Sequence, residues 1–272
     1  MPLSLSEIST PGASFREDLR AYATAGFDGI GIWESKLGDD EFDLAAFGES
    51  GLRATNCVPL VPSILPNAVI EGPLDVEERI ETLCASMVRF ARYEPESVLL
   101  LTGPAGDLSE ADARRVVVQG LQRVAAAAAT VGVKLGLEPI HTSERDWLTL
   151  VTSIPAALDL LAEAGLPDVG IMVDLWHVWD TPTIEDDLRE HIDRITGVHV
   201  ADWFPAGRAD RALPGEGISR TRELTAILAD AGFRGSWDVE IFGDPEQRDS
   251  LWSLPVEQAA RRAYEAAVGV LP

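Results

Sequence analysis

The chain has 272 residues, 46% of them hydrophobic, and a formal net charge of −23 at pH 7. A chain of this size and apolar content can bury a sizeable core, which excludes a disordered protein. Because so negative a surface repels phosphate backbones, and because no run of Lys or Arg offers a basic patch, we expect no nucleic acid as a partner.

We expect a cytoplasmic protein that does not contact a membrane. The first twelve residues, MPLSLSEISTPG, lack the basic and apolar regions of a secretory signal. No apolar run approaches the ~20 residues that a membrane-spanning helix needs. Cys57 and Cys84 are too few for a disulfide framework, which fits a reduced compartment.

Eight apolar segments alternate with helical patterns along the chain. We predict strands at residues 3–9, 27–33, 52–58, 97–102, 133–137, 169–173, 196–200 and 237–241. We predict helices at residues 14–25, 41–50, 75–93, 109–131, 153–164, 185–192, 219–231 and 255–268. The spacing of Ser14 and Glu17 at the first helix is that of a capping box.

This alternation favours a parallel sheet. Eight repeats in 272 residues favour a single (β/α)8 TIM barrel over residues 1–272. No GxGxxG motif follows the first strand, which argues against a Rossmann fold.

Ionisable side chains stand at the ends of four consecutive predicted strands. Glu138 follows the fifth strand, Asp174 ends the sixth, His199 lies in the seventh and Glu240 in the eighth. The carboxyl ends of barrel strands meet at one mouth, so these groups should converge there. Three carboxylates with one imidazole suit Mn²⁺ best, and Mg²⁺, Co²⁺ or Zn²⁺ would also be accommodated.

Each of these residues also has a simpler interpretation. Asp174 stands where an Asp commonly caps a helix, and Glu138 could belong to a loop. Asp202 could take the place of His199. The coincidence of four such strand ends favours a shared task.

The segments LEPIH, VDLWH, HVADW, RALPGEG and VEIF resemble the sugar-phosphate isomerase/epimerase-like family. This xylose isomerase-like TIM barrel, also called AP endonuclease family 2, includes ketose 3-epimerases, inosose dehydratases, hydroxypyruvate isomerases and endonuclease IV. The resemblance is strongest over residues 133–242. It implies the same four metal ligands, Glu138, Asp174, His199 and Glu240.

The resemblance also implies a set of substrate contacts. His177, Arg211 and Glu144 match residues that hold substrate oxygens in the epimerases. Two features depart from those enzymes, namely His141 and an inserted segment at 203–210 before Arg211. Both bear on substrate identity more than on the metal site.

Seven tryptophans are many for this length, and aromatic faces stack on the C–H faces of sugars. We expect Trp33, Trp176 and Trp203 in a pocket wall and Trp237 in the core. The proline-rich segment 59–73 is a candidate lid. Few cations lie near the strand ends, so the expected substrate is an unphosphorylated carbohydrate or cyclic polyol. The cations in question are Lys36, Arg208 and Arg211.

The predicted enzyme is a divalent-metal-dependent sugar isomerase or epimerase. It would act on a ketose through a metal-stabilised enediolate, with Glu138 and Glu240 as acid and base. A dehydratase of the inosose or 3-dehydroshikimate type remains open, because His141 could protonate a leaving hydroxyl. An endonuclease IV-like enzyme is a remote alternative, since the chain has four histidines and a strong negative charge. A homodimer or homotetramer is the assembly to test.

Overall fold

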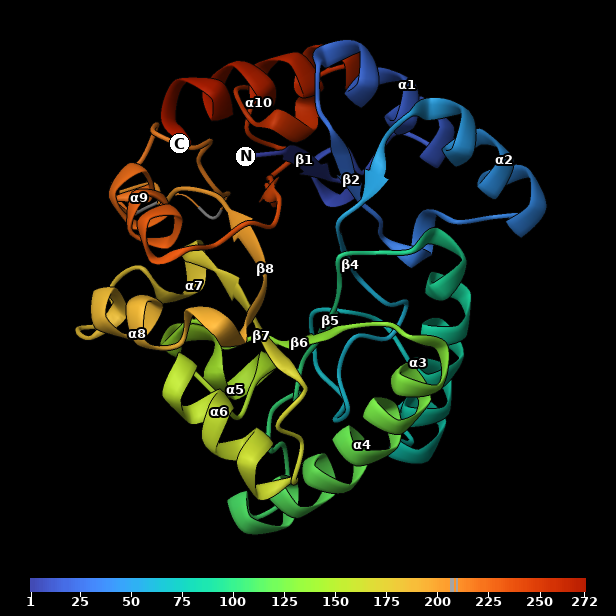
Figure 1. Ribbon diagram of the computed structural model, residues 1–272, viewed down its shortest axis with the longest axis vertical. Coiled ribbons are helices and arrows are strands. Elements are labelled where there is room, and N and C mark those ends of the chain that lie inside the picture. Colours follow the sequence, from blue (N-terminus) through green and yellow to red (C-terminus); the bar gives the residue numbers. More distant parts are fainter. Residues whose placement is uncertain (206–207, 209) are drawn as a thin grey trace.

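The computed structural model describes residues 1–205, 208 and 210–272. Within these residues, nine short parallel strands form a nearly closed barrel that helices surround (Figure 1). The strand order is β3-β2-β1-β9-β8-β7-β6-β5-β4. The strands are β1 (Leu3–Ser6), β2 (Gly29–Gly31), β3 (Arg53–Ala54), β4 (Asn56–Cys57), β5 (Ser97–Leu100), β6 (Leu135–Leu137), β7 (Gly170–Asp174), β8 (Ile195–Val200) and β9 (Trp237–Val239).

Two of these strands are pieces of one predicted strand. β3 pairs with β2 and β4 pairs with β5, on either side of Thr55. The Thr55 hydroxyl donates across the barrel to Asp238 Oδ2 at 3.2 Å. If β3 and β4 are counted as one interrupted strand, the barrel has eight strands, so the (β/α)8 prediction is confirmed.

Each predicted helix is present with small shifts at its ends. Asp75 and Ser109 cap their helices, accepting hydrogen bonds from the backbone N–H of Glu78 and Asp112. The capping box at Ser14 is also present. The helices are α1 (Phe15–Ala25), α2 (Asp40–Ser50), α3 (Val76–Phe90), α4 (Glu110–Val131), α6 (Ile154–Glu163), α8 (Ile184–Glu190), α9 (Thr221–Ala231) and α10 (Val256–Val270), with short turns α5 (Arg145–Leu148) and α7 (Leu175–Val178).

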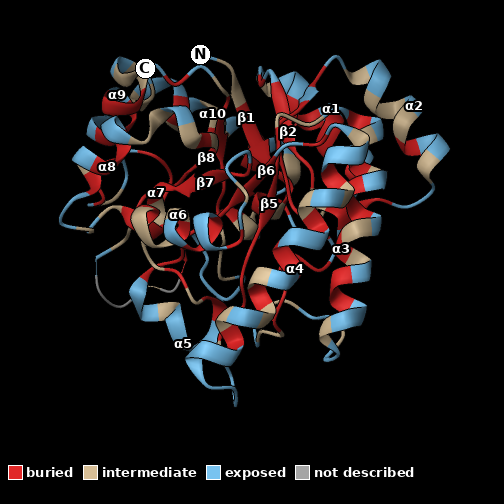
Figure 2. Ribbon diagram, turned by 60° about the horizontal axis from the view of Figure 1, so that its bottom comes forward, coloured by how far each residue is buried: buried red, intermediate tan, exposed pale blue. Residues whose placement is uncertain are grey.

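The main hydrophobic core lies between the strands and the helix ring. Figure 2 shows the strands buried, and helices such as α3 and α4 with buried residues on one face and exposed residues on the other. Trp237 is fully buried, as predicted. Each buried leucine of this layer contributes about 2 kcal/mol through removal of its apolar surface from water.

The described helices include none that is long and apolar enough to cross a membrane. Both cysteines are free, with Cys57 buried and Cys84 half-buried. Burial raises the pKa of the Cys57 thiol, so this group is an inert part of the core.

Candidate metal centre and active site

The four predicted metal ligands come together at the carboxyl ends of β6 to β9. Asp174, the last residue of β7, is in register with His199 of β8. Glu138 follows β6 and Glu240 follows β9, and both backbone N–H groups remain bonded to the neighbouring strand. All four side chains are buried. The sheet register therefore aims them into one volume.

Their distances define a compact centre. Glu138, Asp174 and His199 each offer one ligand atom, and these atoms lie within 4.8 Å of one another. His199 Nδ1 is 3.3 Å from Glu138 Oε1 and 3.5 Å from Glu240 Oε2. Glu240 thus belongs to the same cluster, because it and Glu138 both lie close to His199 Nδ1.

Arg211 lies between two members of this centre. Its Nη1 donates to Asp174 Oδ2 at 2.7 Å and to Glu240 Oε2 at 3.1 Å. The guanidinium is buried and rests over the rings of Trp176 and Phe242, at 4.8 and 4.6 Å from their centroids. Since Arg211 N also donates to Phe242 O at 2.8 Å, backbone and side chain are both held.

Burial and charge shift the titration of the centre. Desolvation raises the pKa of Glu138 to about 7. Burial alone would lower the pKa of His199, but Glu240 and Glu138 outweigh it and raise the pKa to about 10. Burial alone would raise the pKa of Asp174, but Arg211 and the other neighbours of Asp174 hold that pKa below its ordinary value. The buried carboxylates therefore stabilise positively charged groups in the centre.

The donor set fits a divalent cation. Three buried carboxylates repel one another unless cations compensate them. Among the described residues that line the pocket, Arg211 is the one Lys or Arg. His199 turns Nδ1 toward the carboxylates and Nε2 toward Asp238 Oδ2, 4.0 Å away. At that distance no hydrogen bond forms, and His199 Nε2 is a buried atom without a hydrogen-bond partner among the described residues.

Asp174 has two roles, one for each oxygen. Oδ1 accepts a hydrogen bond from Trp176 N at 2.9 Å and caps the short helix α7. Oδ2 faces Arg211 and the centre. The helix-cap interpretation and the ligand interpretation, posed as alternatives from the sequence, are therefore compatible.

Among the predicted substrate contacts, His177 and Glu144 line the pocket. His177 Nδ1 accepts from the backbone N–H of His141 at 3.2 Å, and its Nε2 lies 3.3 Å from Arg211 Nη2. Burial lowers the pKa of His177 to about 3, so the ring is neutral. His177 is thus a neutral hydrogen-bonding group beside Asp174.

His141 and Trp203 lie outside the pocket lining. The His141 ring bonds to Ser143 Oγ at 2.7 Å and faces Asp180 Oδ2 at 3.2 Å. Trp203 stacks behind Trp176, with ring centroids 4.2 Å apart. The structure thus places Trp176 in the wall and Trp203 as its support. Proximity in sequence to the strand ends did not distinguish these two positions.

The sequence interpretation also missed three buried residues that contact the centre or its surroundings. Ser6 Oγ donates to Glu240 Oε1 at 3.3 Å and accepts from Trp33 Nε1 at 2.9 Å. Glu7 Oε2 accepts from Trp33 N at 2.9 Å, and Asp238 faces His199. β1 ends at Ser6, whereas the predicted strand ran to residue 9, so the strand-end rule was applied at a position beyond Ser6 and Glu7.

Asp202, the alternative to His199, has a different task. Its carboxylate accepts hydrogen bonds from Trp203 N, Gly215 N and Ser219 N at 2.8 to 3.0 Å. It holds the loop that brings Arg211 to the centre. Ser219 is bonded to Asp202 and Arg220 has a left-handed backbone with a φ of 57°, so α9 begins at Thr221, whereas the sequence predicted a helix from residue 219.

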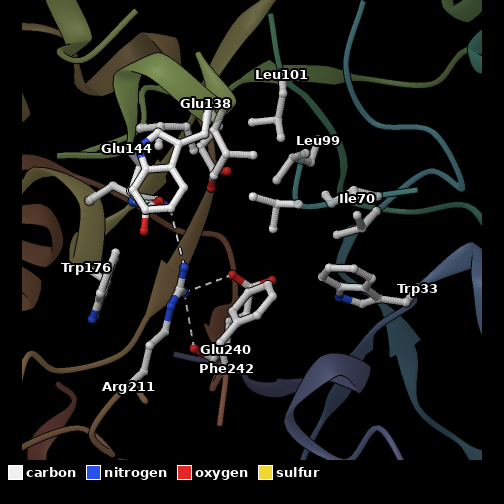
Figure 3. A pocket seen from close by; sticks show the side chains of 16 residues that line it. Trp33, Ile70, Leu99, Leu101, Glu138, Glu144, Trp176, Arg211, Glu240 and Phe242 are labelled. Carbon is white, nitrogen blue, oxygen red and sulfur yellow. Dashed lines mark hydrogen bonds and ion pairs between the residues drawn. The ribbon is translucent and has the colours of Figure 1, made fainter. Parts of the chain in front are cut away.

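The pocket above the centre has a volume of about 860 Å³, including open solvent at its mouth. Figure 3 shows Glu138, Glu144, Arg211 and Glu240 directed into it. Trp33 also lines it.

The candidate lid divides into two parts. Ile64 N and Leu65 N donate to the backbone at residues 101 and 102, so the first half is bound to the barrel. Val69 and Ile70, in the second half, line the pocket mouth. Residues 206, 207 and 209 of the inserted segment 203–210 lie outside the described residues.

The cations considered for a phosphate group are all engaged by carboxylates. Lys36 Nζ bonds to Asp18 Oδ2 at 2.5 Å. Arg208 bonds to Asp210 and Asp249, at 2.5 and 2.8 Å. With Arg211 held as described, this supports the expectation of an unphosphorylated substrate.

Comparison with known proteins identifies the family. The model of the xylose isomerase-like TIM barrel matches residues 19–267. The chain belongs to this family. Its fold also agrees with the crystal structure of the IolI protein with a bound zinc atom, at a TM-score of 0.81 and 20% identity over 100% of this chain and 98% of the other.

Two curated relatives carry named activities. The inosose isomerase of Halalkalibacterium halodurans is 26% identical over 168 residues, 60% of this chain and 56% of that protein. The 3-dehydroshikimate dehydratase of Pseudomonas aeruginosa is 27% identical over 268 residues, 90% of this chain and 38% of that protein. The chain thus spans about half or less of the length of these relatives.

Proposed function

We propose that the protein is a divalent-metal-dependent isomerase or epimerase of the sugar class, which moves a proton at the carbon beside the carbonyl of a hydroxy-ketone. The observation that carries the proposal is the convergence of Glu138, Asp174, His199 and Glu240 at the carboxyl ends of β6 to β9, where Glu138 and Glu240 also line the pocket. These four residues would hold the metal. When bound, the metal supplies Lewis acidity, with Mn²⁺ as the first candidate.

The two glutamates have different surroundings, which suits them to different steps. Glu240 is held at both oxygens, by Ser6 and by Arg211. Glu138 has one bonded oxygen, Oε1, facing His199. We assign the removal of the proton to Glu138 and its return to Glu240. Arg211 and His177 orient the substrate oxygens, and Trp176 limits access of water.

The inosose isomerase relative supports the isomerase class, and the zinc atom in the IolI structure supports a divalent metal in this kind of barrel. The partner that we propose is a small uncharged molecule.

A dehydratase is the second candidate, because the 3-dehydroshikimate dehydratase relative matches 90% of this chain. The extra acid suggested by the sequence, His141, lies outside the pocket lining and faces Asp180. In a dehydratase, the proton for the leaving hydroxyl would therefore come from Glu144 or Glu240.

The test is hydrogen exchange in D₂O with Mn²⁺ and a panel of hydroxy-ketones, followed by NMR. Exchange at the carbon beside the carbonyl without loss of water supports an isomerase or epimerase, whereas an enone product identifies the dehydratase. Glu138→Gln should slow exchange about a hundredfold or more. The matched control Glu110→Gln changes an exposed glutamate of α4 and should leave the rate unchanged. Metal-independent exchange would refute the proposal.

A further inference from the structure

The lining of the pocket separates into a polar side and an apolar side. Eleven of its sixteen lining residues are aliphatic or aromatic. Among the described lining residues there is no Ser, Thr, Asn, Gln, Tyr or Lys. The polar ones are all titratable and stand at or near the metal centre, namely Glu138, Glu144, His177, Arg211 and Glu240.

The apolar side is built at the ends of β4 and β5, and β5 pairs with β6, the strand that Glu138 follows. Leu99 and Leu101 alternate with Val98 and Leu100, so the first pair points into the barrel and the second toward the helices. Leu99 and Leu101 form one buried cluster with Val58 and with the loop after β6. Figure 3 shows Leu99 and Leu101 across the cavity from Arg211.

A fully hydroxylated sugar or inositol ring does not match this wall. A hydroxyl pressed against Val58, Leu99 and Leu101 would lose its hydrogen bonds to water and gain none from the protein. A carboxylate or phosphate does not match the polar side either. Three glutamates line that side, and the Nη1 group of Arg211 is already shared by Asp174 and Glu240.

We propose that the substrate is an uncharged hydroxy-ketone whose side remote from the reacting carbons carries no hydroxyl groups, that is, a deoxygenated carbocycle or a deoxyketose. Its hydroxy-ketone end faces Glu138, Arg211 and Glu240, and its C–H side lies against Leu99 and Leu101. The inference takes the hydroxy-ketone end from the proposed function. The apolar contact is inferred only from the apolar side of the pocket, at Val58, Leu99 and Leu101.

Two unreactive ring diols test the contact directly. Both cis-1,2-cyclohexanediol and myo-inositol present neighbouring hydroxyls, but only the first has an apolar far side. Their dissociation constants for the Mn²⁺-loaded protein are measured by calorimetry and by the fluorescence of the pocket tryptophans Trp33 and Trp176. We expect the cyclohexanediol to bind about 10- to 100-fold more tightly. Equal or tighter binding of myo-inositol, or saturable binding of neither diol, overturns the inference.

A substitution in the wall should reduce this preference. Val58→Thr adds a hydroxyl with little change in shape and should lower the preference for cyclohexanediol about tenfold. The matched control is Val88→Thr on α3, where the side chain is 58% exposed, and it should leave both constants unchanged. Thermal melting confirms that each variant is folded. An unchanged preference in folded Val58→Thr also counts against the inference.

These measurements need no turnover, so the two proposals can fail separately. A diol preference without metal-dependent proton exchange would refute the proposed function and leave the apolar contact in place. Exchange on fully hydroxylated ketoses, together with a preference for myo-inositol, would support the function and overturn the substrate inference.

Discussion

Ser6 donates a hydrogen bond from Oγ to Glu240 Oε1 at 3.3 Å, although 234 positions separate them in the chain. The bond joins the ends of β1 and β9, which are neighbours in the barrel. Trp33 Nε1 donates to the same Ser6 oxygen, so the serine proton is directed at the carboxylate. Ser6 is therefore a positioning residue for Glu240.

Ser6→Ala should lower kcat/KM about tenfold, because Glu240 loses the group that orients Oε1. The loss should appear mainly in kcat and should be smaller in Ser6→Thr, which retains the hydroxyl. Ser97→Ala removes another buried strand hydroxyl, one that bonds to Thr196, and serves as control. Equal effects of Ser6→Ala and Ser97→Ala would show that the role is only structural.

Asp174→Asn should retain the fold and lose the metal. The amide oxygen can still cap α7 at Trp176 N, but the charge that faces the centre disappears. We expect Mn²⁺ affinity to fall about a hundredfold or more, measured by calorimetry. The control is Asp75→Asn. Asp75 caps α3 by accepting a hydrogen bond from Glu78 N, and the Mn²⁺ affinity of this variant should match that of the wild type.

Removal of metal should lower thermal stability, because it leaves three carboxylates buried together. At a hundredfold excess of metal over its dissociation constant, binding contributes about 2.7 kcal/mol, or roughly 5 °C in Tm. The measurement is calorimetric melting with Mn²⁺ and after chelation. Asp174→Asn should show no such difference. A wild-type Tm that chelation does not change would contradict the metal site.

The buried cluster of Glu7, Asp18 and Lys36 should make stability depend on pH. Desolvation and the nearby Asp18 raise the pKa of Glu7 well above its ordinary value of 4.5. Above pH 4.5 the unfolded chain therefore releases this proton before the folded protein does, and stability falls as pH rises toward the folded pKa. Glu7→Gln, which resembles the protonated acid, should avoid that loss.

The measurement is urea unfolding of the wild type and Glu7→Gln across pH 4 to 8. The advantage of the variant should grow as the pH rises above 4.5. A constant difference at every pH would show that Glu7 does not titrate in this range.

Asp202→Ala should destabilise the fold by about 2–4 kcal/mol, because it leaves the donors of Trp203, Gly215 and Ser219 unsatisfied. Mn²⁺ affinity of the folded fraction should change little. Asp168→Ala alters an exposed aspartate and should cost less than 0.5 kcal/mol, roughly the range of surface changes. A large loss of metal affinity in Asp202→Ala would instead make this carboxylate a ligand.

The sequence by itself determined the barrel and the ligand set to be tested. Strand and helix periods are local, and a carboxylate directly after an apolar run, such as Glu138 or Glu240, marks a strand end. These signals depend on a few adjacent residues, so they can be recognised without knowing which distant segments meet.

Only the tertiary structure decided which side chains meet across the mouth. Trp176 and Trp203 have similar sequence settings, yet one faces the pocket and the other supports it from behind. The bond from Ser6 to Glu240 and the apolar wall at Leu99 and Leu101 arise where segments far apart in the chain pack together. Periodicity identifies the inward face of each strand, whereas the packing of those faces against one another determines what the pocket binds.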